Sequence, residues 1–204
     1  MAQFSLFGSR ESGHTYKVRM LLSMAGIAHQ YTEIDLTQPR EQRPEPFRTL
    51  AKFGEVPLLV MDGQPFVQSD AILLHLAEHA GCFGGESPER LARMREWLFW
   101  EANRIGFSLP NLRYGRRFVA GGLASAVEAF LRARFDADIA RLESELSDGR
   151  AFMLDDTPTI ADLALSAYMF WPEQAGVTLP PAVSAWLGRI ASLPGWRHPD
   201  DMPA

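Results

Sequence analysis

The sequence lacks the features that would place the protein in several specialised classes. It contains one cysteine, Cys82, among 204 residues, which excludes an internal disulfide and any zinc site built on paired cysteines. No apolar run approaches the roughly 18 residues that a membrane-spanning helix needs. The N-terminal stretch MAQFSLFGSRES has no basic segment followed by an apolar one, as an export signal would show. These absences predict a cytoplasmic protein without a membrane partner.

Neither sign of charge is in large excess. The chain has 25 acidic and 20 basic residues and a net charge of -5, so nucleic acid is not an expected partner. With 47% hydrophobic and 22% charged residues, the composition suits one large domain or two small ones. We find no internal repeat and no low-complexity tract.

Residues 1–80 alternate between strand and helix patterns. Two apolar runs in EVPLLVMDGQPFV flank Asp62-Gly63, a dipeptide suited to a type I′ turn, which predicts an antiparallel hairpin. The segment QSDAILLHLAEHAG follows as a helix, and Ser69 is able to cap its N-terminus. The predicted order is β-α-β-α-β-β-α, with the elements before the hairpin at residues 3–7, 15–25, 29–36 and 47–50.

The second half of the chain has helical patterns throughout. Residues 81–87, GCFGGES, are small and glycine-rich and predict a linker. Ser87 and Pro88 suit the cap and first turn of a helix, and a last helix is expected over residues 181–193. Another helix opens at TIAD, where Thr159 and Asp162 have the spacing of a capping box. A long helix over residues 123–146 is predicted to bury one stripe, formed by Val127, Leu131, Phe135, Ile139, Leu142 and Leu146.

Four segments in this order resemble motifs of the cytosolic glutathione S-transferase family. SGHTYKVRMLL resembles the active-site turn and first helix of its serine-type classes, and GEVPLL resembles its cis-proline segment. QSDAILLHLA resembles the opening of its third helix, and TPTIADLAL resembles its capping motif in the helical domain. The resemblance implies an α/β plus all-α fold. A thioredoxin-like, glutathione-binding domain would span residues 1–80 and an all-helical domain residues 88–204, joined by the linker 81–87.

The resemblance makes Ser12 the expected catalytic residue. The thiolate of glutathione is the nucleophile, and a free thiol has a pKa of about 8.5. A hydroxyl that donates to the sulfur and a nearby helix N-terminus both favour the thiolate. Lowering the pKa by about two units requires about 2.7 kcal/mol, which these two interactions can supply. Ser9 is the alternative carrier of the hydroxyl, and Ser12 on its own could also be a plain helix cap.

The resemblance also implies residues that bind glutathione. Val56, before a cis Pro57, would pair its backbone N–H and C=O with the cysteinyl backbone of glutathione. Ser69 and nearby free N–H groups suit the γ-glutamyl carboxylate, and Gln68 can accept from the γ-glutamyl ammonium. Read alone, Pro57 could equally be a proline that starts a strand.

One glutathione contact departs from the family pattern. Some classes place a lysine directly before the Val-Pro pair to meet the glycine carboxylate, but here Glu55 would repel that group. Gln42 or Lys52 are the replacements that we consider.

The segment EWLFWEANRIGFSLPNLRYGRRF lies where the family lines its electrophile pocket. An apolar pocket with an arginine suits an aromatic electrophile, including an anionic one. The tryptophans could instead be core or dimer contacts. The expected pocket residues are Trp100, Arg104, Phe107, Arg113 and Tyr114.

Three histidines could suggest other chemistry. His75 and His79 lie in H-x-x-E-H, an inverted zinc-peptidase signature, but the pentapeptide ends a helix that the transferase pattern already explains. We therefore expect no metal site. His14 could tune the charge of the active site near neutral pH, or it could be a solvated residue at the helix start.

The resemblance thus implies a glutathione transferase of the kind used in detoxification, with glutathione as co-substrate and a small electrophile as second substrate. The family also implies a homodimer. One alternative is an isomerase of the maleylacetoacetate type, although that class usually carries Ser-Ser-Cys where this chain has Ser-Gly-His. Another is a non-catalytic binding module with the same fold. Thiol–disulfide exchange is disfavoured because the turn has no cysteine.

Overall fold

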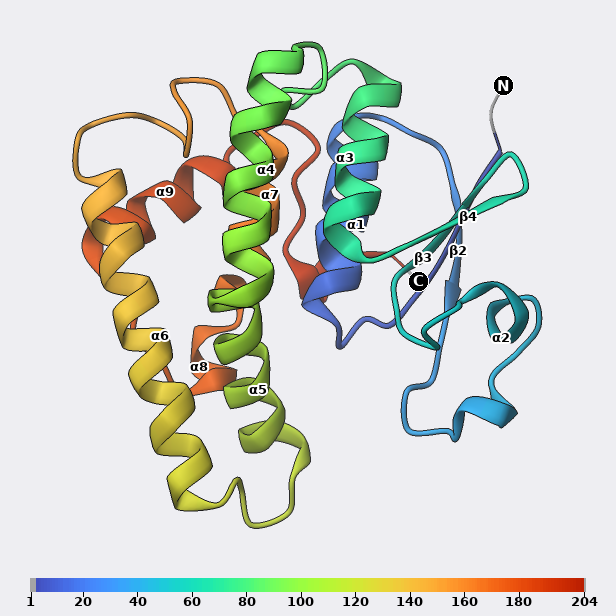
Figure 1. Ribbon diagram of the computed structural model, residues 1–204, viewed down its shortest axis with the longest axis horizontal. Coiled ribbons are helices and arrows are strands. Elements are labelled where there is room, and N and C mark those ends of the chain that lie inside the picture. Colours follow the sequence, from blue (N-terminus) through green and yellow to red (C-terminus); the bar gives the residue numbers. More distant parts are fainter. Residues whose placement is uncertain (1–2, 204) are drawn as a thin grey trace.

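The computed structural model describes residues 3–203 and contains a mixed sheet beside a group of helices (Figure 1). The sheet has strand order β2-β1-β3-β4. Strand β1 (Phe4–Gly8) pairs parallel with β2 (Gln30–Glu33) and antiparallel with β3 (Leu58–Met61). Strand β4 (Gln64–Val67) closes the hairpin with β3. The predicted thioredoxin-like arrangement of strands and helices is confirmed.

The two faces of the sheet are covered by different helices. Helices α1 (Gly13–Met24) and α3 (Ser69–Ala80) lie on one face, between the sheet and the helical part of the chain, and the short α2 (Phe47–Leu50) lies on the other (Figure 1). Because successive strand side chains point to opposite faces, Leu6 joins the large core with α1 and α3. Phe7 and Leu58 pack with Phe47 in a second, small core.

The hairpin turn and the start of α3 depend on unusual backbone angles. Asp62 and Gly63 have φ of 50° and 80°, the left-handed values that a type I′ turn requires, so this prediction is confirmed. The prediction that Ser69 caps α3 is wrong. Gln68, with φ of 70°, is the residue before the helix, and Ser69 is its first helical residue.

The C-terminal part of the chain consists of helices. They are α4 (Pro88–Asn103), α5 (Ile105–Phe118), α6 (Ser125–Leu146), α7 (Ile160–Ser166), α8 (Pro172–Ala175) and α9 (Pro181–Ala191). Ser87 caps α4 by accepting from Arg90 N–H, and Thr159 and Asp162 form the predicted capping box of α7. The predicted stripe of α6 is buried from Leu131 onward, but Val127 is 48% exposed near the start of the helix.

The last residues of the chain return to the sheet-containing part. Tyr16 Oη on α1 donates to the Arg197 carbonyl at 2.8 Å, and Ser23 Oγ donates to the Gly195 carbonyl at 2.7 Å. These bonds hold the C-terminal segment against α1. The sheet-containing part and the helical part also share one continuous hydrophobic core. Within residues 3–203, no helix combines the length and apolar character that crossing a membrane demands.

Candidate functional site

Two adjoining cavities lie between the sheet-containing part and helices α4 and α5. Their volumes are about 520 and 990 Å³. His14, Glu55, Val56 and Pro110 line both cavities, so the two meet along these residues. The loops at one end of the sheet and the first turn of α1 supply the opposing wall.

Ser12 lies at the N-terminus of α1 and lines the larger cavity. Its Oγ accepts from Thr15 N–H at 3.2 Å, so it is the helix cap, and only 7% of the residue is exposed. Ser9 lines the same cavity, and its Oγ accepts from Glu11 N–H at 3.4 Å. The structure therefore places both candidate serines at the cavity, and only Ser12 also has the helix N-terminus beside its hydroxyl.

The Val56-Pro57 bond is cis, as the resemblance implied, and both residues line the smaller cavity. The pairing of β3 with its neighbours begins at Leu58, so Val56 lies just before the ladder. Gln68 and Ser69 line the same cavity. Gln68 Nε2 donates to Glu55 Oε2 at 3.2 Å, so the carboxylate of Glu55 is already paired with a neighbouring amide.

The structure does not bring Gln42 to either cavity. It lies on the 3-10 helix Arg40–Gln42, whereas its neighbours Arg40 and Arg43 line the larger cavity. Arg43 Nη1 donates to the Gly54 carbonyl at 2.7 Å, and its buried Nε has no partner among the described residues. The basic pair in PREQRP was the signal that sequence reasoning overlooked.

The predicted electrophile pocket is only partly assembled. Phe107 lines the smaller cavity, and Arg113 and Tyr114 line the larger. Trp100 and Arg104 line neither cavity, so the structure does not bring them together with the other three residues. Trp100 packs edge-to-face against Trp97, and Arg104 pairs with the buried carboxylate of Asp138 at 2.7 Å.

Arg113 is not free to bind an anionic substrate. It is 3% exposed, and it donates to both the carbonyl and the side-chain carboxylate of Glu11, at 2.6 and 2.7 Å. Arg117 binds the same carboxylate at 2.8 Å, and the Arg113 guanidinium stacks over Trp171 at 4.2 Å. Because Glu11 precedes Ser12, these bonds hold the serine turn against the helical part.

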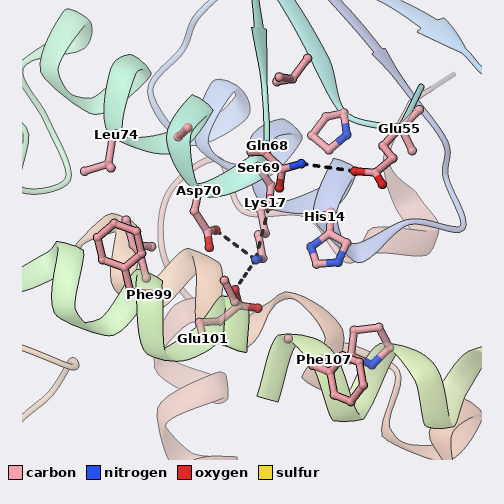
Figure 2. A pocket seen from close by; sticks show the side chains of 18 of the residues that line it. His14, Lys17, Glu55, Gln68, Ser69, Asp70, Leu74, Phe99, Glu101 and Phe107 are labelled. Carbon is pink, nitrogen blue, oxygen red and sulfur yellow. Dashed lines mark hydrogen bonds and ion pairs between the residues drawn. The ribbon is translucent and has the colours of Figure 1, made fainter. Parts of the chain in front are cut away.

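A buried ion cluster forms one wall of the smaller cavity. Figure 2 shows the Lys17 side chain directed toward Asp70 and Glu101. Lys17 Nζ donates to Glu101 Oε2 at 2.7 Å and to Asp70 Oδ1 at 3.1 Å, and it lies 3.5 Å from Ser69 Oγ. Burial alone would lower the pKa of Lys17, but the two carboxylates outweigh this effect and raise it. One ammonium thus joins α1, α3 and α4.

Glu101 should make stability depend on pH. Burial raises its pKa from 4.5 to about 8, although the Lys17 ammonium opposes this shift. Between these two values the folded protein holds a proton that the unfolded chain has released, so the free energy of unfolding should fall as pH rises. Urea unfolding of wild type and Glu101→Gln across this window measures the effect. In the variant, the free energy of unfolding should no longer fall with pH across this window. The same dependence on pH in both proteins would contradict the raised pKa of Glu101.

The three histidines pack against aromatic side chains. Burial lowers the pKa of His14 to about 3, so it stays neutral at physiological pH and does not tune the charge, although the half-buried side chain lines both cavities. Its buried Nδ1 has no partner in the described part of the chain. His75 stacks on Phe66, and His79 packs edge-on against Phe4. No group of three or more potential metal ligands occurs within residues 3–203.

The comparisons with known proteins agree with this arrangement. Residues 6–88 match the family model of the glutathione S-transferase N-terminal domain, and residues 109–189 match that of the C-terminal domain. A solved glutathione S-transferase from Xanthobacter autotrophicus Py2 is 32% identical, with a TM-score of 0.85 and 96% of each chain covered. The matches therefore extend over both the sheet-containing and the helical part.

Two curated relatives are also similar along nearly their whole length. Maleylacetoacetate isomerase of Rhizobium meliloti (strain 1021) is 29% identical over 205 residues, which cover 96% of this chain and 95% of the relative. Disulfide-bond oxidoreductase YfcG of Escherichia coli (strain K12) is 26% identical over 200 residues, covering 92% of this chain and 89% of the relative. The three relatives carry different names, so the specific reaction must be argued from the site.

Proposed function

The chain belongs to the glutathione S-transferase family, and on this premise we propose that it is a glutathione transferase acting on a small, electrophilic, aromatic substrate. The observation that carries the proposal is the position of Ser12. Its hydroxyl lies at the N-terminus of α1 and lines the 990 Å³ cavity together with Val56. This placement suits stabilisation of a thiolate held beside the serine.

In the proposed reaction Ser12 donates a hydrogen bond to the glutathione sulfur and favours loss of the thiol proton to water. The sulfur then forms a bond to an electrophilic carbon, and a leaving group such as halide departs with its electron pair. Most of the rate enhancement would come from activating the nucleophile and from holding the two substrates together. No residue of the protein is covalently modified.

Different parts of glutathione would lie in the two cavities. The backbone of Val56 would pair with the cysteinyl unit, and Ser69 and Gln68 would bind the γ-glutamyl end in the smaller cavity. We assign the glycine carboxylate to Arg40 and Arg43 in place of Gln42. These arginines line the larger cavity and carry the charge that the carboxylate requires.

The second substrate would occupy the apolar part of the larger cavity. Tyr114, Phe118 and Leu36 are all more than 40% exposed there and offer an aromatic and aliphatic surface. Because Arg113 is bound by Glu11, a neutral aromatic electrophile fits better than an anionic one. We further propose, from the family, that the protein is a cytoplasmic homodimer.

Two relatives with the same fold carry the names of other functions. The similarity to maleylacetoacetate isomerase favours a glutathione-dependent isomerase as the second candidate. The similarity to YfcG points to disulfide reduction. Cys82 lines neither cavity, and burial raises its pKa, so any exchange here would have to proceed on the sulfur of glutathione. A non-catalytic binding module would bind glutathione without turnover.

Calorimetric titration with glutathione, followed by a conjugation assay with a chloronitrobenzene electrophile, tests the proposal. We expect binding and turnover. Binding without turnover of this or other electrophiles would favour the binding module, and no binding at millimolar glutathione would contradict the proposal.

The assignment of Arg40 can be tested with glutathione that is esterified at its glycine carboxylate. Wild type should bind the ester about tenfold more weakly than glutathione, since one charge-assisted hydrogen bond is lost. Arg40→Gln should lose most of this preference, and Arg40→Gln combined with Arg43→Gln should bind both ligands about equally. Arg48→Gln is the matched control, because Arg48 pairs with Glu45 outside both cavities. A full preference for free glutathione in Arg40→Gln would show that another residue meets the carboxylate.

A further inference from the structure

The peptide unit that joins Glu11 to Ser12 is held at both of its polar ends. Its N–H, from Ser12, donates to the Ser9 carbonyl at 3.0 Å, and its carbonyl, from Glu11, accepts from Arg113 Nη1 at 2.6 Å. Because a peptide unit is planar, these two bonds together fix the orientation of its plane. The bond from Thr15 N–H to Ser12 Oγ, at 3.2 Å, then fixes the side chain that leaves this plane.

The guanidinium of Arg113 is itself immobilised on all sides. Its Nη2 donates to the Glu11 carboxylate at 2.7 Å, and its Nε donates to Gln174 Oε1 at 2.7 Å. Its flat face lies 4.2 Å from the ring centre of Trp171, whose indole N–H donates to Asp200 at 2.9 Å. Each of its three nitrogens thus has a partner, and the side chain is 4% exposed. A planar fork held in this way can transmit its own position to the Glu11 carbonyl.

Arg117 binds the same glutamate without reaching this peptide. It lies one turn after Arg113 on α5, and its Nε and Nη2 donate to the Glu11 carboxylate at 3.0 and 2.8 Å. Within residues 3–203, Arg117 forms no hydrogen bond with the backbone of the turn. The two arginines therefore share one carboxylate, but only Arg113 also holds the backbone that precedes Ser12.

A hydrogen bond weakens steeply as its distance and angle depart from the preferred values. The hydroxyl of Ser12 can stabilise a thiolate only from the position in which the turn presents it. A peptide unit held at its N–H alone could tilt and carry the hydroxyl away from the sulfur. The bond from Arg113 to the Glu11 carbonyl opposes this tilt.

We propose that Arg113 is a positioning residue that fixes the peptide unit before Ser12 so that the serine hydroxyl meets the glutathione sulfur. This inference rests on the proposed function, because it needs glutathione beside Ser12. It makes activation of the thiol depend on a residue of the helical part. It also gives Arg113 a role other than the contact with the electrophile that the sequence suggested.

The test follows the thiolate absorption of bound glutathione against pH in Arg113→Met and in Arg117→Met. Arg113→Met should raise the pKa of the bound thiol by about 0.5 unit, a part of what the serine hydrogen bond supplies. Arg117→Met is the matched control. It also removes one cation from the Glu11 carboxylate but leaves the carbonyl held, so we expect a shift of less than about 0.2 unit. All variants should bind S-methylglutathione, which has no thiol, as tightly as wild type does.

A second variant keeps the test valid if Arg113→Met does not fold. Arg113→Lys retains the positive charge but lacks the planar fork that reaches the carbonyl and the carboxylate together. It should therefore raise the pKa of the bound thiol in the same direction as Arg113→Met.

A Ser12→Ala background separates positioning from the loss of a charge near the sulfur. The loss of charge would raise the pKa of the thiol whether or not the serine is present, whereas positioning acts only through Ser12. Arg113→Met should therefore cause no further shift once the serine is gone. An unchanged thiol titration in both Arg113 variants, or an equal shift in the two backgrounds, would overturn the inference. Normal glutathione binding by wild type together with such a result would leave the proposed function standing, and failure of wild type to bind glutathione would overturn both.

Discussion

Replacing Lys17 by methionine is expected to lower the free energy of unfolding by about 3–5 kcal/mol. The side chain is fully buried and its ammonium is shared by Glu101 and Asp70. Without it, the Asp70 carboxylate and a buried acid lie together with no cation between them. Urea unfolding, read as a shifted midpoint at unchanged slope, measures the loss.

The chain supplies a matched control, since Lys52 is its other lysine and is exposed. Lys52→Met should change stability by less than about 0.5 kcal/mol. Adding Asp70→Asn to Lys17→Met should restore part of the loss, because the unpaired carboxylate is removed. A Lys17→Met protein as stable as the Lys52→Met protein would show that the cluster does not hold the two parts of the chain together.

Ser12→Ala is expected to lower kcat/KM for glutathione conjugation by about tenfold at neutral pH. The alanine cannot donate to the sulfur, and the loss of about one of the two pKa units corresponds to this factor, because the N-terminus of α1 still stabilises the thiolate. The affinity for S-methylglutathione should stay near the wild-type value, since the proposed contacts at Val56 and Ser69 are untouched.

Ser9→Ala is the control for Ser12→Ala. Ser9 lines the same cavity, but the backbone N–H of Glu11 donates to its Oγ and it lies outside the first turn of α1. We expect a loss of less than about threefold, because the Ser9 hydroxyl does not lie beside the helix N-terminus that favours the thiolate. A larger loss in Ser9→Ala than in Ser12→Ala would transfer the catalytic role to Ser9.

The elements that local rules determine could be predicted from the sequence. Asp62-Gly63 favours a tight hairpin turn, and Thr159 and Asp162 satisfy each other within one helical turn. Ser12 belongs to this group, since helix caps are local. The prediction that Ser69 caps α3 failed because Gln68, which has a positive φ, is the residue before the helix. Little in the sequence predicts a positive φ for a glutamine.

The parts of the site that depend on distant contacts could not be predicted. Lys17 meets Asp70 and Glu101 across 53 and 84 positions of the chain, and a lysine in an amphipathic helix is normally read as exposed. The aromatic and basic segment around Arg104 suggests a cavity residue, yet Arg104 lies at the non-helical junction between α4 and α5 and pairs with Asp138. The prediction named Gln42, whereas the next residue, Arg43, lines the cavity. Gln42 lies on a 3-10 helix, where neighbouring side chains point in different directions.

The measurement that tests the central claim most directly is the ultraviolet titration of glutathione bound to wild type and to Ser12→Ala. The central claim is that the protein binds glutathione and that Ser12 stabilises its thiolate. Wild type should then show thiolate absorption at a pH about two units below that of free glutathione, and Ser12→Ala should show it about one unit closer to the value of the free thiol. Identical titrations in the two proteins would contradict the account.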